Sequence, residues 1–329
     1  MALFGSKQDT RRLGTPARPA HSVSSDRPRL LGLGWLGLKA ADTVAEARFL
    51  ENVLKLKFVD EVTTADGHVV RYRAGQLELE LVAGGATWAT RPKPRHGQPD
   101  ISLIPSLQFN HLNDFVKNLQ EHEVPETRVF EQGWGASVLF FDPERNLWQG
   151  DEIRVEPDVA QDNLPGIGAL WLSVEDFAAQ VAFYRDVLGL EEINEGDYHP
   201  PITEAVESYN AQHPVINPAT TGGETTVKEP TLPTGAVFRA GNIRLALSPG
   251  GQRLEDNRGR VWGQDTAFLP GFQTSDLNGF ARLLNEAGIQ TTGPHPFFYV
   301  NPTPRGPQRR PGSALRFCDP EGHPIQVYQ

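Results

Sequence analysis

The sequence predicts an α+β protein made of four consecutive units, each containing a strand, a helix and three further strands. Two observations carry this prediction: the chain contains itself twice, and each copy shows the same order of elements twice. The repeat is too long for a solenoid, so it indicates duplication of a whole domain.

Three stretches align the two copies. Arg73-Ala74-Gly75-Gln76-Leu77 recurs as Arg239-Ala240-Gly241-Asn242-Ile243, Phe140-Phe141-Asp142-Pro143-Glu144 recurs as Phe317-Cys318-Asp319-Pro320-Glu321, and Pro105-Ser106-Leu107-Gln108 recurs as Pro270-Gly271-Phe272-Gln273. The alignment lets positions that face a shared cavity be compared between the copies.

The first unit, residues 31–83, shows the order of elements most clearly. A strand-like run over 31–40 is followed by Asp42, which can cap a helix whose apolar residues fall near helical spacing. The turn Ala65-Asp66-Gly67 between two strand-like runs predicts a β-hairpin. A last strand over 76–82 completes the unit.

The same order fits the second, third and fourth units. These cover residues 103–150, 168–248 and 266–329. The helix-start position is filled by Asp42, His111, Asp176 and Asp276, which explains His111 as a capping residue.

The units group into two predicted domains. We expect a disordered basic tail over 1–29, a first domain over 30–150, a linker over 151–166 and a second domain over 167–329. The second domain carries two insertions, 194–235 and 294–312.

Composition excludes several classes of protein. The apolar share of 38% and charged share of 22% are typical of a globular protein, and the net charge of -10 argues against nucleic acid as a partner. No apolar run reaches the roughly 18 residues that cross a bilayer, and the N-terminus lacks the apolar core of a signal peptide. The single cysteine cannot form an internal disulfide. We therefore expect a cytoplasmic protein with no membrane contact.

A family resemblance follows from Phe183-Tyr184-Arg185-Asp186-Val187-Leu188-Gly189-Leu190, from Gly133-Trp134-Gly135 and from the two Asp-Pro-Glu turns. With these motifs in repeated order, residues 30–329 resemble the vicinal oxygen chelate superfamily of glyoxalases, extradiol dioxygenases and bleomycin-resistance proteins. The resemblance implies tandem βαβββ units that form two open, curled mixed β-sheet half-barrels with helices outside. Duplication already supplies the paired units, so either a monomer or a homodimer is expected.

Catalytic members of this superfamily hold one divalent metal with His, Gln or Glu side chains from the first and last strands of their units. The corresponding first-strand positions are Trp35, Ile104, Ala169 and Leu269, and the last-strand positions are Glu80, Gln149, Ala246 and Gln326. The sequence leaves open which units pair. No pairing gives more than Glu80 with Gln149 or Gln326, so we expect no metal site and no cofactor.

Strand alternation predicts which side chains line the concave faces. The candidates for a ligand pocket are Trp35, Lys39, Glu80, Gln108, Gln149, Trp171, Gln273 and Gln326. Amides and indoles suit a polar or aromatic organic ligand. The alternative is that the glutamines only satisfy internal backbone groups.

The two insertions carry opposite charge. Acidic residues dominate 194–235, whereas 294–312 carries Arg305, Arg309 and Arg310. They are candidates for a lid over the second pocket or, for the arginines, an anchor for an anionic ligand. Solvated loop charge is the alternative.

Gly32-Leu33-Gly34-Trp35-Leu36-Gly37 matches the GxGxxG pattern of dinucleotide-binding turns. That pattern should follow a strand and open a helix, whereas here it lies within a predicted strand. We therefore expect these glycines to have a structural role.

Together these observations favour a superfamily protein without the usual metal ligands that binds or sequesters a small polar or aromatic molecule, as bleomycin-resistance proteins do. Two alternatives stay open. One is a lyase or extradiol-type dioxygenase that uses iron, manganese, nickel or zinc with non-standard ligands. The other is a structural or partner-binding protein with filled pockets.

Overall fold

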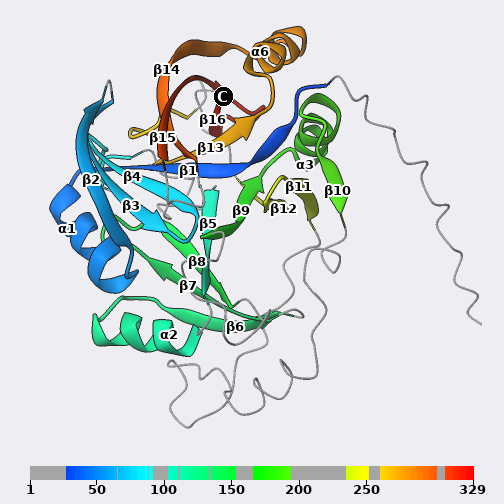
Figure 1. Ribbon diagram of the computed structural model, residues 1–329. Coiled ribbons are helices and arrows are strands. Elements are labelled where there is room, and N and C mark those ends of the chain that lie inside the picture. The colour runs from blue at the N-terminus through cyan, green and yellow to red at the C-terminus, as the bar shows by residue number, and fades with distance from the viewer. Residues whose placement is uncertain are drawn as a thin grey trace, which may run out of the picture.

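The structure, a computed structural model, describes residues 27–64, 66–87, 89–91, 103–109, 112–132, 135–152, 166–193, 235–251, 260–301 and 308–329. They form two eight-stranded mixed sheets with one helix in each unit, and the long strand β1 crosses the middle of the molecule (Figure 1). This confirms the α+β class and the tandem units.

The first sheet combines the first and fourth units in the order β14-β15-β16-β13-β1-β4-β3-β2. Its elements are β1 (Leu30–Ala40), α1 (Thr43–Arg48), β2 (Lys57–Thr64), β3 (Gly67–Ala74), β4 (Leu77–Ala83), β13 (Phe268–Thr274), α6 (Leu277–Glu286), β14 (Thr291–Asn301), β15 (Gln308–Cys318) and β16 (Pro324–Tyr328). The two units join where β1 runs antiparallel to β13.

The second sheet combines the second and third units in the order β10-β11-β12-β9-β5-β8-β7-β6. Its elements are β5 (Leu103–Phe109), α2 (Leu112–Glu121), β6 (Arg128–Gln132), β7 (Gly135–Phe141), β8 (Leu147–Glu152), β9 (Ile167–Val174), α3 (Phe177–Ala182), β10 (Glu191–Ile193), β11 (Ala236–Ala240) and β12 (Ile243–Pro249). Each sheet therefore takes one unit from each half of the chain. The division into 30–150 and 167–329 describes the duplication of the sequence, and the sheets do not follow it.

Capping aspartates start the helices as expected. The side chains of Asp42, Asp176 and Asp276 each accept a hydrogen bond from a backbone N–H three residues later, which satisfies a donor that the helix leaves free. His111 lies outside the described residues. The single helices expected after Asp42 and Asp176 instead change into one π-helical turn each, Phe49–Val53 and Phe183–Val187.

The main core lies on the outer faces of the sheets, where the helices pack. It is one continuous cluster that includes residues of both sheets and all four units, such as Leu36, Phe115, Leu170 and Phe280. Side chains of the opposite, inner faces lie outside this cluster. The inner faces are therefore the places to look for a site.

The repeated Asp-Pro-Glu turns connect the two sheets. The Glu144 carboxylate accepts hydrogen bonds from the backbone N–H groups of Ala41 (2.5 Å) and Asp42 (2.7 Å), at the start of α1. In the second copy, Glu321 accepts from Glu175 (2.9 Å) and Asp176 (2.5 Å), at the start of α3. These motifs are present twice because the same contact is built twice.

The repeated Arg-Ala-Gly turns form a second pair of contacts. A Cβ atom on Gly166, just before β9, would lie 1.8 Å from the Ala74 carbonyl oxygen. In the equivalent place, a Cβ on Gly32 would lie 2.4 Å from Asn242 Oδ1, and Asn242 also accepts from the backbone N–H of Leu33 at 2.9 Å. Only glycine allows either approach.

The other two glycines of the GxGxxG pattern also face close neighbours. A Cβ on Gly34 would meet the Tyr328 hydroxyl at 2.2 Å, and one on Gly37 would meet the Trp262 ring at 2.6 Å. The pattern lies within β1 and its glycines serve packing, which confirms the structural role expected for them.

The insertion 294–312 differs from the loop that the sequence suggested. Residues 294–301 and 308–312 extend β14 and β15 into a long antiparallel pair. Insertion 194–235 lies outside the described residues except for Gly235, so the expected lid is left as a prediction. Among the described residues, no helix is long and apolar enough to cross a membrane.

Candidate functional site

The first sheet holds two of the predicted metal-ligand positions. Glu80 on β4 lies beside Gly37 of β1, and Gln326 on β16 lies beside Gly271 of β13. The first unit is therefore paired with the fourth, the arrangement that offers Glu80 and Gln326. In the second sheet, the remaining pair of units offers Gln149 alone.

Arginines occupy the neighbourhood of Glu80 and Gln326. Arg71 Nε lies 3.5 Å from Glu80 Oε1, and Arg316 Nε donates to Gln326 Oε1 at 2.9 Å. Arg71 and Arg316 hold equivalent positions, each opposite the last-strand residue of its own unit. One carboxylate and one amide beside two guanidinium groups do not fit a divalent cation. No group of three or more His, Cys, Asp or Glu side chains with metal-binding geometry occurs in the described part of the chain.

The carboxyl of Glu80 has an altered acidity. Burial raises its pKa to about 7, and Glu78 adds to the rise while Trp35 and Arg71 oppose it. The surroundings of Glu80 therefore disfavour its charged form, even though the Arg71 guanidinium lies nearby.

Aromatic side chains fill the inner face of the first sheet. Trp35 packs edge-on against Trp262 and Phe297, with ring centroids 6.0 and 5.7 Å apart, and Phe297 packs against Tyr328 at 5.1 Å. Lys39 Nζ lies 4.4 Å from the centre of the Trp262 ring. Trp35 and Lys39 thus lie on the inner face as expected, but they pack against protein side chains.

An ion pair joins the two edges of this aromatic cluster. Arg316 on β15 donates to both carboxylate oxygens of Asp66, at 3.1 and 2.7 Å. Asp66 belongs to the turn between β2 and β3. Burial by itself would raise the pKa of Asp66, but the bonds from Arg316 outweigh it and leave the pKa lowered. The hairpin of the first unit is thereby tied to the fourth unit across the sheet.

The inner face of the second sheet carries a buried polar network around Asp151. Its carboxylate accepts hydrogen bonds from the hydroxyl of Ser106, from the hydroxyl of Ser137 at 2.6 Å and from Gln149 Nε2 at 2.7 Å. Arg244 Nη2 lies 3.8 Å from the same carboxylate. Burial raises the pKa of Asp151, and these donors oppose the rise.

Trp171 lies next to this network on the same inner face. In the sheet it pairs with Ala246 of β12 and Ile104 of β5, and the Arg244 guanidinium lies 5.9 Å from the centre of its ring. The indole nitrogen of Trp171 is buried and has no hydrogen-bond partner among the described residues. Ala169 takes the place that Trp35 has in the first sheet, so this position of the second inner face carries a methyl group where the first carries an indole.

The remaining predicted residues are dispersed. The Gln108 side chain lies against Gly168, where a Cβ atom would be 2.1 Å from Gln108 Nε2. Gln273 pairs with Gly32 in the first sheet. Arg309 and Arg310 are exposed on β15, and Arg309 lies 5.0 Å from the Phe298 ring. Arg305 lies outside the described residues.

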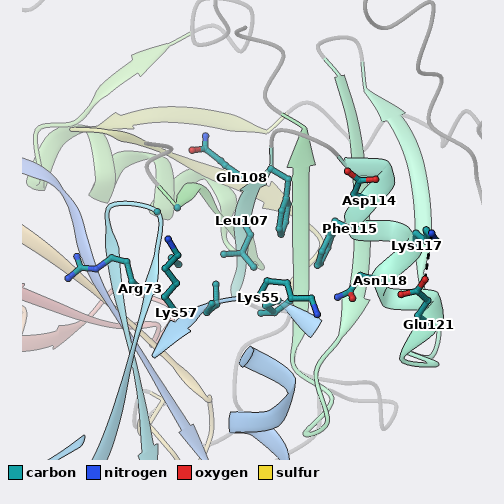
Figure 2. Close-up of a pocket in the computed structure, with 16 residues that line it drawn as sticks. Lys55, Lys57, Arg73, Leu107, Gln108, Asp114, Phe115, Lys117, Asn118 and Glu121 are labelled. Carbon is teal, nitrogen blue, oxygen red and sulfur yellow. Dashed lines mark ion pairs between the residues drawn. The ribbon is translucent and has the colours of Figure 1, made fainter. Parts of the chain in front are cut away.

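A groove lies between the first unit and the second (Figure 2). Its volume is about 640 Å³, within the range of small-molecule sites. Lys55, Lys57 and Arg73 line it from the first unit, while Gln108 and α2 line it from the second.

Solved structures of other proteins have the same architecture. The chain is similar to a candidate dioxygenase from Bacillus subtilis, with a TM-score of 0.56 and 14% identity over 91% of this chain and 85% of that one. It is also similar to glyoxalase I from Zea mays, with a TM-score of 0.50 and 11% identity over 92% of each chain. The chain has the vicinal oxygen chelate fold. No family model and no curated protein sequence matches it.

Within the vicinal oxygen chelate fold, several inner-face residues had escaped sequence reasoning. Strand alternation gives three of them once the last-strand positions are known, because Arg71 lies opposite Glu80 and Asp151 and Arg244 each lie two residues from such a position. Ser137 follows one step later, since it lies opposite Asp151. Trp262 carries no such signal, since it belongs to a connection before β13.

Proposed function

We propose that this protein binds a small organic molecule with an aromatic part and polar groups, at the inner face of the second sheet and without a divalent metal. The observation that carries the proposal is the buried indole N–H of Trp171, which has no partner among the described residues. A buried donor without a partner costs about 1–3 kcal/mol, and a ligand oxygen would remove that cost.

The surroundings of Trp171 favour an aromatic ligand with an acceptor group. Indole rings stack on flat ligands, and the Arg244 guanidinium beside the ring favours a partner that carries negative charge. Ala246 lies beside Trp171 in the sheet, whereas Trp262 and Phe297 pack edge-on against Trp35. The Asp151 network fixes Ser106, Ser137 and Gln149 as rigid walls.

The first sheet favours the structural alternative for its own inner face. Trp35, Trp262 and Tyr328 pack against each other there, and Arg71 stands beside Glu80 where the fold places a metal in its catalytic members. We therefore assign ligand binding to the second sheet and a packing role to the first.

Thermal-shift measurements with benzoate, salicylate and catechol test the proposal, because a ligand that binds the folded state raises Tm. We expect at least one probe to stabilise the protein. Trp171→Phe, which keeps an aromatic ring but loses the indole N–H, should reduce the Tm shift. The matched control Trp35→Phe changes the inner face of the first sheet and should leave the shift intact. No shift with any probe, or an equal shift in Trp171→Phe, would overturn the assignment.

Metal analysis tests the other half of the proposal. Protein purified without chelator should contain no stoichiometric iron, manganese, nickel or zinc. One bound ion per chain would instead favour a lyase or dioxygenase with non-standard ligands.

A further inference from the structure

The groove between the first two units combines an apolar floor with a cationic rim. Leu107 and Phe109 of β5 line it, and the Phe109 ring stacks on Phe115 of α2 with centroids 4.0 Å apart. The cations are Lys55, Lys57, Arg73 and Lys117, and the acids are Asp114 and Glu121.

Lys117 and Arg73 each lie near an acidic side chain. Lys117 Nζ lies 3.7 Å from Glu121, and Arg73 Nη2 lies 3.9 Å from Glu78. Lys55 has no ion pair within the described part of the chain. The groove therefore keeps positive charge at the end formed by the first unit.

Lys55 also has an unusual backbone. Its φ of 56° is in the left-handed region, which is unfavourable for a residue with a side chain. The equivalent residue of the third unit is Gly189, with φ 69° and the same flanking backbone hydrogen bonds. Strain of this kind is concentrated at functional sites, and the duplication shows that the fold accepts glycine here.

The equivalent space in the second copy is treated differently. There the chain fills it with its own Arg27, whose guanidinium donates to the carbonyl oxygens of Asp186 (2.7 Å) and Val187 (3.1 Å) beside Gly189. Glu191 replaces Lys57 and lies 3.3 Å from Arg239. The second copy is thus neutralised internally, whereas in the first copy Lys55 keeps its charge at the groove.

We propose that the groove binds an organic anion, with an aromatic or aliphatic body on Leu107 and Phe109 and an acidic group near Lys55. Trp171 and Asp151 do not line the groove, so the site stands independently of the function proposed for the second sheet. Carboxylate, sulfonate and phosphate groups share the required chemistry.

Fluorescence titration of the full chain with 8-anilinonaphthalene-1-sulfonate, an aromatic sulfonate, tests the site. We expect Lys55→Gly to weaken binding about threefold to fivefold, as for loss of one exposed charge contact, and Lys57→Glu to weaken it further. Lys55→Gly copies Gly189 and removes left-handed strain, so the variant should fold at least as well as the wild type.

Two controls make the outcome decisive. Arg282→Glu reverses an exposed charge on α6, at the place equivalent to Lys117, and should leave affinity unchanged. Trp171→Phe should also leave it unchanged. Wild-type affinity in both lysine variants, an equal loss in Arg282→Glu, or a loss confined to Trp171→Phe would each overturn the groove site.

Discussion

Glu46 and Gln180 occupy the same position in the two halves of the chain, four residues after the capping aspartates of α1 and α3, and both side chains are fully buried. With its amide nitrogen toward Asp319, Gln180 donates to Asp319 Oδ2 at 3.3 Å and accepts from the backbone N–H of Glu321 at 2.9 Å. Glu46 faces the equivalent acids, Asp142 and Glu144. Burial, followed by these two carboxylates, raises its pKa well above 4.5.

Replacing Glu46 with glutamine should stabilise the protein at neutral pH. Because the folded state holds a proton on Glu46 above the pH at which the unfolded chain releases it, this residue's contribution to stability falls as pH rises above about 4.5. Glu46→Gln removes that loss and gives the first half of the chain the amide that Gln180 provides in the second half. We expect about 1–3 kcal/mol more stability at pH 8 and a flatter pH dependence, measured by urea unfolding.

The reciprocal variant supplies the control. Gln180→Glu should bring the same pH dependence into the second half and destabilise the protein increasingly from pH 5 to pH 8. Identical pH profiles for the wild type and Glu46→Gln would show that Glu46 is ionised in the folded protein.

Gly166→Ala should be severely destabilising. The new methyl group would overlap the Ala74 carbonyl oxygen, and φ is 91° there. We expect a loss of roughly 3 kcal/mol or more from the clash and the strain together. Gly288→Ala is the matched control, since φ is 76° with no heavy atom within 4 Å, and it should cost only about 1–2 kcal/mol. Similar losses for both would contradict the close approach between the halves.

Removing the Glu321 carboxylate should loosen the start of α3. Glu321→Ala leaves the N–H groups of Glu175 and Asp176 without their acceptor, at a cost of roughly 2–4 kcal/mol. Hydrogen exchange of these two amides should accelerate, and Glu321→Gln should show a smaller loss. Glu286→Ala, at an exposed position of α6, should change stability by less than about 0.5 kcal/mol. Unchanged exchange at Glu175 and Asp176 would exclude the connecting role of the turn.

Sequence reasoning predicted the units well because local signals define them. Asp42, Asp176 and Asp276 marked helix starts, and the Asp66-Gly67 turn marked a hairpin. The pairing of units was open because it depends on contacts between segments far apart in the chain. β1 pairs with β13, more than two hundred residues later.

The candidate site was harder to predict for a related reason. Gln149 and Gln326 could be named from the sequence, but their partners, Asp151 and Arg316, determine what they do. The repeated motifs proved to be contacts between parts of the chain, at Glu144, Glu321, Gly32 and Gly166. Such motifs report the architecture and carry little information about a ligand.

Trp262 offers a direct test of the packing role assigned to the first sheet. Its ring lies against Trp35 and under the cations of Lys39 and Arg316, and its Nε1 donates to the Ala267 carbonyl at 2.8 Å. Trp262→Ala should cost about 3–5 kcal/mol by leaving a cavity. Because that cavity has the shape of an indole, added indole should raise the Tm of Trp262→Ala more than that of the wild type. Failure of indole to bind would mean that Phe297 and Tyr328 collapse into the space, whereas an equal rise in both proteins would show that indole binds outside the new cavity.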